Sequence, residues 1–290
     1  MISESKAQTN DIKTFKNSPV VADGAALKLI SNQFAFTEGP ATDKSGNVFF
    51  TDQPNNKIWK YDTNGKLSVF LSDSGRSNGM FFDKKGNLIS CADEHNQLWA
   101  ISPEGKVTVL VKDFDGLHFN GPNDVFVTPA GGIYFTDPYY QRSYWTRKTP
   151  EIKGQKVYFL KGKNDAVVVV DDLKKPNGII GTPDGKYLYV ADIEGNKTYK
   201  YTIAADGMLK DEKVFTDQGS DGMTIDEKGN LYLTGKGVTV YNSEGKKIEH
   251  IDVPADWTGN ITFGGKERSF LFITASQNIY TLKMKVKGVY

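Results

Sequence analysis

The sequence has little cysteine and no excess of either charge. Cys91 is the one cysteine among 290 residues, which excludes an internal disulfide and any zinc or iron–sulfur centre built on several cysteines. Lysine and arginine total 36 against 35 aspartates and glutamates, for a net charge of +1. Binding to bulk nucleic acid normally requires a basic surplus, so we expect no nucleic-acid partner.

Long apolar runs are also missing. No stretch approaches the roughly 20 apolar residues of a membrane span, and the polar segment from Met1 to Ala25 lacks the apolar core of a signal peptide. We expect no membrane association, and no obligate protein partner is evident. The compartment stays open, because the chain could be cytoplasmic, or periplasmic or secreted with a signal segment already removed.

What the sequence does contain is a repeat. Two apolar runs that flank a short turn, usually ending in glycine, recur six times, and the sixth copy is degraded. The turn positions are Gly46, Gly86, Gly131, Gly185, Gly229 and Glu267. They lie 40, 45, 54, 44 and 38 residues apart. Turns of this composition between β-rich segments are typical of hairpins.

A second hairpin follows the first in most repeats, which gives four strands in about 40–45 residues, the length of a propeller blade. We therefore predict an all-β, six-bladed β-propeller, with four antiparallel strands per blade. Residues 1–25 are expected to form a polar extension and residues 26–290 a single domain. The segment Ala26–Ser31 is expected to complete the last blade and close the ring, which protects strand edges. Generic hairpins in a sandwich or barrel are the alternative, and the near-constant period argues against it.

One position per blade is expected to face the central axis. Counting back eight residues from each turn position gives Glu38, Asn78, Asn123, Asn177, Asp221 and Gly259. The first five carry a side-chain oxygen, and equivalent positions of a ring must converge near one point. The alternative is a water-filled channel that polar side chains line without binding an ion. Two carboxylates and three amides, without a basic residue, favour a hard divalent cation. We expect Ca²⁺ ahead of Mg²⁺, with Mn²⁺ and Zn²⁺ as further possibilities.

Four short segments contain the ring positions: Phe36-Thr-Glu-Gly-Pro40, Phe119-Asn-Gly-Pro-Asn-Asp-Val125, Lys175-Pro-Asn-Gly-Ile179 and Ser220-Asp-Gly-Met223. These segments resemble the family of gluconolactonase, senescence marker protein (regucalcin) and luciferin-regenerating enzyme. The similarity extends over residues 30–280 and is closest to the bacterial gluconolactonases, to whose Tyr-Phe-Thr-Asp-Pro segment Tyr134–Pro138 is similar.

The resemblance implies roles for particular residues. The family's cation ligands are a Glu, two Asn and an Asp, which correspond to Glu38, Asn123, Asn177 and Asp221. Asp221 would also be the general acid/base. Asn78, His118 and Asn120 are the expected substrate contacts. Family members often have a basic residue at the position of His118, so we expect a different substrate preference.

The implied function is metal-dependent hydrolysis of a small sugar lactone, which makes that lactone the expected partner. The cation would polarise the carbonyl, and Asp221 would either take the proton from the attacking water or only orient that water. Two alternatives remain: hydrolysis of phosphotriesters, since diisopropyl fluorophosphatase shares this fold, and a non-enzymatic binding propeller with a structural Ca²⁺. An aromatic cluster in the long insertion, at Tyr139, Tyr140, Tyr144 and Trp145, could either cover a sugar ring or pack beneath its own loop.

Overall fold

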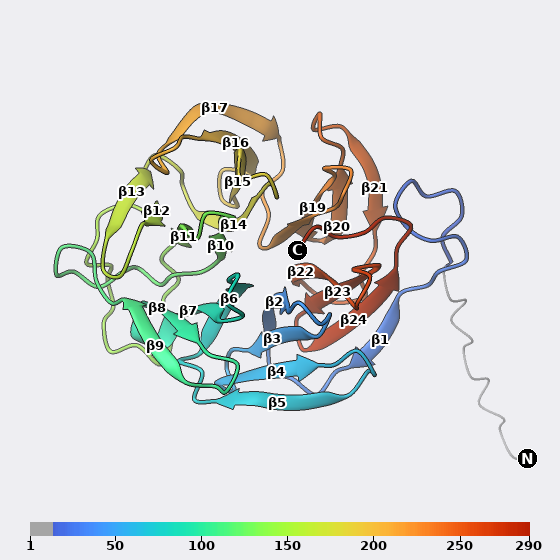
Figure 1. The fold of residues 1–290 in the computed structure, drawn as a ribbon, viewed down its shortest axis with the longest axis horizontal. Helices are drawn as coiled ribbons and strands as arrows, with labels where there is room; N and C mark the ends of the chain where they lie inside the picture. Colours follow the sequence, from blue (N-terminus) through green and yellow to red (C-terminus); the bar gives the residue numbers. More distant parts are fainter. Residues whose placement is uncertain (1–13) are drawn as a thin grey trace, which may run out of the picture.

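The sequence repeats form the blades of a six-bladed β-propeller in the computed structural model, which describes residues 14–290. Six sheets, each of four antiparallel strands, surround one axis (Figure 1). The single helix among the described residues is the three-residue 3-10 segment η1 (Asp93–His95). In this part of the chain, no helix has the length and apolar character to cross a membrane. The predicted fold class is therefore confirmed.

The strands fall into four concentric sets. The innermost strands are β2 (Thr37–Thr42), β6 (Ser77–Phe82), β10 (Val125–Val127), β14 (Pro176–Gly181), β18 (Met223–Ile225) and β22 (Thr258–Gly264). The second strands are β3 (Val48–Asp52), β7 (Leu88–Ala92), β11 (Ile133–Asp137), β15 (Tyr187–Asp192), β19 (Leu231–Gly235) and β23 (Phe270–Ala275). The third strands are β4 (Lys57–Tyr61), β8 (Gln97–Ile101), β12 (Lys156–Leu160), β16 (Lys197–Ile203), β20 (Gly237–Tyr241) and β24 (Asn278–Lys283). The outer strands are β5 (Leu67–Ser72), β9 (Val107–Val111), β13 (Ala166–Val170), β17 (Leu209–Thr216), β21 (Lys247–Ile251) and β1 (Lys28–Ser31).

The N-terminal strand closes the ring, as the sequence predicts. Strand β1 pairs antiparallel with β24, in a register that places Lys28 opposite Thr281, and so completes the sixth blade. The strand begins at Lys28, two residues later than predicted. Of the predicted extension, residues 1–13 lie outside the described residues. Residues 14–25 rest on the sixth blade, where Val20 and Val21 pack with Met284.

Local side-chain chemistry explains the repeated turns. In the first blade, Asp43 Oδ1 accepts the backbone N–H groups of Ser45 and Asn47, and Asn47 Nδ2 donates to Asp43 Oδ2. An aspartate at the start of a turn forms such bonds readily. The same pattern recurs between Asp83 and Asn87 and between Asp226 and Asn230. In these three blades, the repeat therefore encodes the hairpin between the first two strands.

Apolar side chains between neighbouring blades form the core. Phe50 of the first blade packs with Phe272 of the sixth, and their ring centroids lie 5.4 Å apart. Phe126 of the third blade lies in one buried cluster with Ile179 of the fourth. Because burial of apolar surface is the main favourable term in folding, this packing fixes the blades around the axis and sets the height of each inner strand.

Candidate active site

The five polar ring positions predicted from the repeat lie in one cavity of about 240 Å³. The cavity is at the end of the channel where the inner strands begin. It is lined by Glu38, Asn78, Asn123, Asn177 and Asp221, together with Phe36, Gln53, Tyr140, Arg142, Ile193 and Trp257. The ring side chains are buried, except that Asp221 is partly exposed. A volume below the roughly 300–1,000 Å³ of drug-sized pockets suits a small molecule.

Glycines next to the ring allow the inner strands to approach one another closely. A Cβ atom on Gly39 would lie 2.0 Å from the carbonyl oxygen of Asn78 in the next blade. A Cβ atom on Gly79 would lie 2.3 Å from Asp124 Oδ1. Real atoms do not approach so closely, so these positions require glycine if the ring is to be this narrow. The Glu-Gly and Asn-Gly pairs of the sequence are thus a geometric signature of the axis.

Two blades place a polar side chain where the others have glycine. Asp124 and Asn260 follow their ring positions directly and fill the axis beneath the cavity. Asp124 Oδ1 accepts the N–H of Val125, and Oδ2 accepts that of Ile179. Burial raises the pKa of Asp124 to about 7, although these bonds and the amide of Asn260 oppose the shift. The amide of Asn260 also stabilises the Glu38 carboxylate, so this layer supports the cavity floor.

The two carboxylates of the ring oppose each other's ionisation. Burial raises the pKa of Glu38 well above its usual range, and the charge of Asp221 raises it further. Burial also raises the pKa of Asp221, whereas hydrogen bonds from Trp257 and Asn177 and the charge of Arg142 lower it. The indole Nε1 of Trp257 donates to Asp221 Oδ2 at 2.6 Å. Both acids are therefore difficult to ionise together unless a positive charge compensates them.

The oxygen atoms of the ring fit a hard divalent cation. Oδ1 of Asn177 is buried and has no hydrogen-bond donor among the described residues, whereas Nδ2 donates to the Tyr140 hydroxyl at 3.0 Å. In the described chain, no three His, Cys, Asp or Glu side chains gather as a metal-binding group. A cation here would consequently depend on the amide oxygens of Asn123 and Asn177 in addition to the two carboxylates, a donor set that Ca²⁺ accepts.

Two of the three predicted substrate contacts lie away from the cavity. The His118 side chain is 60% exposed, and its Nδ1 lies 2.8 Å from Glu151 Oε1. Asn120 is fully buried, and its Nδ2 donates to the carbonyl oxygens of Asp137 and Gly154. Asn78 does line the cavity. The role of each as a substrate contact stays a prediction.

Aspartates at the ends of second strands anchor the loops that lead to the ring. Asp52 Oδ1 accepts the N–H groups of Ala35 and Phe36, just before Glu38. Asp137 accepts those of Asn120 and Gly121 before Asn123. Asp192 does the same for Lys174 and Lys175 before Asn177. These bonds hold the starts of three inner strands, and hence Glu38, Asn123 and Asn177, in place.

The long insertion supplies residues that the repeat does not reveal. Tyr140 enters the cavity wall, whereas Trp145 is buried beneath the loop, where its Nε1 donates to the carbonyl oxygen of Asp93. Packing beneath the loop therefore applies to Trp145, whereas contact of Tyr140 with a sugar ring stays a prediction. The sequence analysis also did not identify Trp257 and Arg142. Arg142 lies in the insertion of the third blade, and Trp257 lies two residues before the ring position Gly259.

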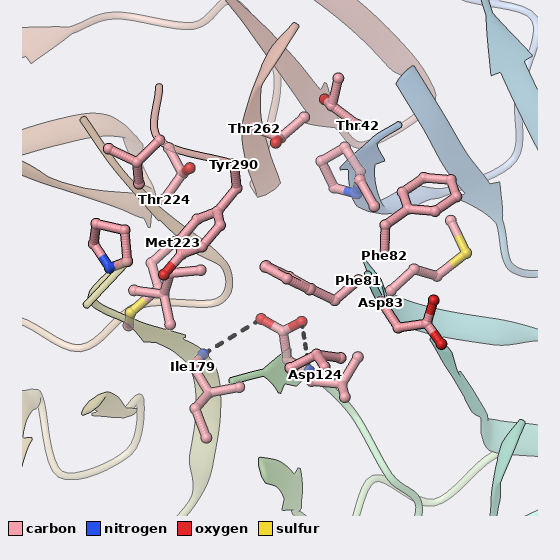
Figure 2. Close-up of a pocket in the computed structure, with 18 of the residues that line it drawn as sticks. Thr42, Phe81, Phe82, Asp83, Asp124, Ile179, Met223, Thr224, Thr262 and Tyr290 are labelled. Atoms are coloured by element: carbon pink, nitrogen blue, oxygen red, sulfur yellow. Dashed lines mark hydrogen bonds between the residues drawn. The ribbon is translucent and has the colours of Figure 1, made fainter. Parts of the chain in front are cut away.

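A larger cavity, of about 440 Å³, lies at the opposite end of the channel (Figure 2). Its walls are mostly apolar, with Met80, Phe81, Ile179 and Met223 among the lining residues. Tyr290 points into it and donates its hydroxyl to the carbonyl oxygen of Gly181 at 2.7 Å. Asp124 lines its inner end. Unlike the ring, this end gathers mostly apolar side chains from the part of the chain that the structure describes.

The fold and the ring together define a six-bladed propeller with an oxygen-lined cavity on its axis. The family model described as the SMP-30/Gluconolactonase/LRE-like region matches residues 36–277. The chain belongs to this family.

Individual relatives agree with this assignment. A gluconolactonase of Zymomonas mobilis is 28% identical over 293 residues, which cover 90% of this chain and 82% of that protein. A solved gluconolactonase of Xanthomonas campestris is 27% identical with a TM-score of 0.85, covering 94% of this chain and 93% of its own. A regucalcin of Agrobacterium tumefaciens, described as a calcium-binding protein, has a TM-score of 0.78 at 20% identity, covering 92% and 96%. At that identity, the likeness to regucalcin shows the fold alone.

Proposed function

We propose that this chain is a lactonase that opens a small sugar lactone of the gluconolactone type and needs a divalent cation, with Ca²⁺ as the expected ion. One observation carries the proposal: Asp221 shares an axial cavity with Glu38, Asn123 and Asn177, in a chain of the gluconolactonase family. The names of the Zymomonas and Xanthomonas relatives support the substrate class.

The ring residues would hold the cation. Glu38, Asn123, Asn177 and Asp221 supply the oxygen ligands, and the bound ion would supply Lewis-acid polarisation of the lactone carbonyl. Asn78 lies in the same cavity and would bind a hydroxyl group of the sugar ring.

Asp221 would move the proton. Trp257 Nε1 fixes its Oδ2, so the carboxylate has a defined orientation toward the cavity. The carboxylate accepts a proton from the water that attacks the carbonyl carbon. It then delivers this proton to the ring oxygen as the acyl carbon–oxygen bond breaks, which leaves the hydroxy acid.

The test is hydrolysis of glucono-1,5-lactone followed by pH-stat titration. We expect turnover to disappear after treatment with EDTA and to return with Ca²⁺, with Mg²⁺, Mn²⁺ and Zn²⁺ as comparisons. Metal-loaded protein that opens no lactone in a panel of ring sizes would refute the proposal. Hydrolysis of a phosphotriester by the same preparation, without lactone opening, would replace it with the phosphotriesterase alternative.

A further inference from the structure

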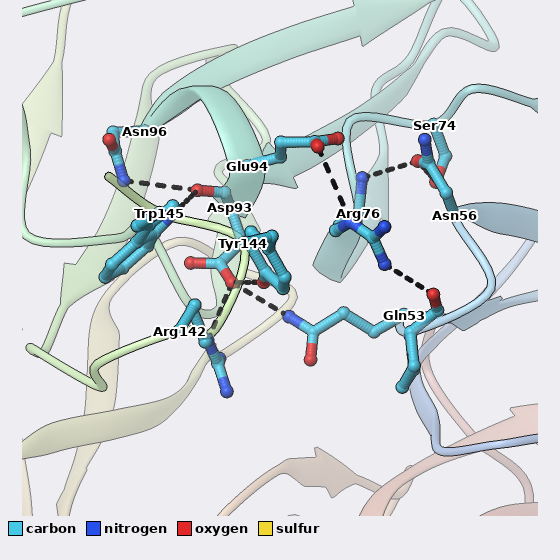
Figure 3. A network of polar contacts seen from close by, with 11 residues as sticks. Gln53, Asn56, Ser74, Arg76, Asp93, Glu94, Asn96, Arg142, Tyr144 and Trp145 are labelled. Carbon is cyan, nitrogen blue, oxygen red and sulfur yellow. Dashed lines mark hydrogen bonds and ion pairs between the residues drawn. The ribbon is translucent and has the colours of Figure 1, made fainter. Parts of the chain in front are cut away.

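Arg142 is the one basic residue among the described residues that line the active-site cavity. It lies in the insertion of the third blade, and Figure 3 shows the contacts that hold it. Its Nε donates to Asp93 Oδ2 at 2.8 Å. The same oxygen accepts hydrogen bonds from Gln53 Nε2 at 3.1 Å and from the Tyr144 hydroxyl. Asp93 is buried. Three hydrogen-bond donors thus converge on one buried carboxylate behind the cavity wall.

This arrangement leaves the end of the guanidinium group available. With Nε bound to Asp93, the two η nitrogens of Arg142 have no hydrogen-bond acceptor among the described residues. The side chain is 24% exposed, and its guanidinium carbon lies 5.5 Å from the centre of the Tyr140 ring, which also lines the cavity. An arginine is always charged, and its planar fork matches two oxygens of one anionic group.

Two cations of neighbouring loops are already paired. Lys175 Nζ lies 3.3 Å from Glu194 Oε2, and Arg76 Nε lies 3.5 Å from Glu94 Oε1. The two acids of the ring would be balanced by a divalent cation. Arg142 is then the group in the cavity that still lacks an acceptor, and a neutral substrate hydroxyl would fill only part of its fork.

We propose that Arg142 forms an anion-binding subsite, and that the preferred substrate is a lactone that carries a phosphate, sulfonate or carboxylate on the part of the molecule away from the reacting carbonyl. This inference rests on the proposed lactonase function and names the substrate class of that site. Asp93 acts as the positioning residue, because it fixes Nε and directs the η nitrogens into the cavity.

The experiment compares 6-phosphogluconolactone with glucono-1,5-lactone for the wild type, Arg142→Met, Arg142→Lys and Lys148→Met. Lys148 is exposed on the same insertion, so its variant controls for the loss of one positive charge. We expect Arg142→Met to lower kcat/KM for the phosphorylated lactone by about 10- to 100-fold, as for a lost hydrogen bond to a charged group. For the neutral lactone the loss should be clearly smaller than for the phosphorylated lactone, Arg142→Lys should retain part of the preference, and Lys148→Met should retain all of it.

A direct binding measurement separates the failure of this inference from the failure of the lactonase function. Calorimetry with 6-phosphogluconate and with gluconate should show that the wild type binds the phosphorylated acid more tightly, and that Arg142→Met loses this difference. If the wild type opens neither lactone, the lactonase function fails and the binding result alone decides the subsite. Equal losses on both lactones, or an unchanged preference in Arg142→Met, would overturn the subsite. Circular dichroism spectra of both Arg142 variants verify that they fold.

Discussion

The two ends of the central channel are built from the same six inner strands, and yet they have opposite character. Where these strands begin, a cavity of about 240 Å³ gathers five polar side chains. Where they end, a cavity of about 440 Å³ is mostly apolar and contains Tyr290. Cavity volume therefore does not distinguish the end that we propose as the active site. The convergence of oxygen atoms does, because it follows from equivalent positions of the six blades at one height along the axis.

Each inner strand extends from one cavity to the other, and a layer of residues between the cavities separates them. Glycines such as Gly39 and Gly79 let the strands meet closely, and the side chains of Asp124 and Asn260 fill the remaining space. Beyond this layer the inner strands carry residues such as Met80 and Ile179, which pack as an ordinary core. If the comparison is right, substitutions at the polar end should alter activity, and substitutions at the apolar end should alter stability alone.

The largest effect is expected from Asp221→Asn at the polar end. The amide cannot accept the proton of the attacking water, and loss of general acid–base catalysis typically costs about 10²- to 10⁴-fold in rate. The matched change at the apolar end is Thr224→Val, because Thr224 is buried and lines the larger cavity. We expect its kcat/KM for glucono-1,5-lactone to stay within about twofold of the wild type. The measurement is pH-stat titration of both variants loaded with Ca²⁺.

This pair of variants can also break the comparison. If Asp221→Asn keeps full activity while its circular dichroism spectrum is native, Asp221 is not the acid/base. If Thr224→Val loses activity as strongly as Asp221→Asn does, the apolar end contributes to catalysis and the functional division of the channel is wrong.

The second effect concerns stability at the polar end, and its sign depends on the cation. Burial and the charge of Asp221 both raise the pKa of Glu38, so Glu38→Gln should increase the free energy of unfolding of the metal-free protein at pH 8. Calcium at 100 times its Kd should stabilise the wild type by about 2.7 kcal/mol. The variant has lost a charged ligand and should gain much less. Urea unfolding with EDTA and with Ca²⁺ measures all four free energies.

Asn87→Ala is a suitable control, because Asn87 supports a hairpin turn through Asp83 and lies outside the ring. It should lose stability by the same amount with and without Ca²⁺. A Glu38→Gln variant that is destabilised in EDTA, or that responds to Ca²⁺ as the wild type does, would contradict the assignment of Glu38 as a ligand.

The sequence predicts the fold well because each blade repeats its own local signals. The Asp-x-x-Gly-Asn turns form their hydrogen bonds within five residues, so the hairpins can be recognised without knowledge of the tertiary structure. The closing strand could be predicted because the last blade otherwise has three strands. Its start at Lys28 rather than Ala26 depends on pairing with β24, which no local pattern specifies.

In the candidate site, too, the sequence predicts the residues at repeated positions and not those in the loops. Counting back from the turns locates Glu38, Asn78, Asn123, Asn177 and Asp221, because the repeat fixes the height of each inner strand. The repeat does not fix the positions of residues in the loops in this way. Trp257 and Arg142 reach the cavity through contacts with Asp221 and Asp93 that are distant in sequence, and His118 is turned outward by Glu151. Tertiary hydrogen bonds decide these directions, so spacing alone could not predict them.

The smallest effect is expected at the apolar end, from Tyr290→Phe. The Tyr290 hydroxyl donates to the carbonyl oxygen of Gly181 at 2.7 Å, and its ring packs edge-on against Phe81 and Phe126. The variant keeps the ring and loses one hydrogen bond, so the free energy of unfolding should fall by about 1 kcal/mol, with lactone hydrolysis unchanged. Tyr187→Phe is the matched control, since Tyr187 is 36% exposed at the surface and should change stability by less than about 0.5 kcal/mol. If Tyr290→Phe lowers kcat/KM without lowering stability, the far end of the channel communicates with the ring, and the separation of the two ends is refuted.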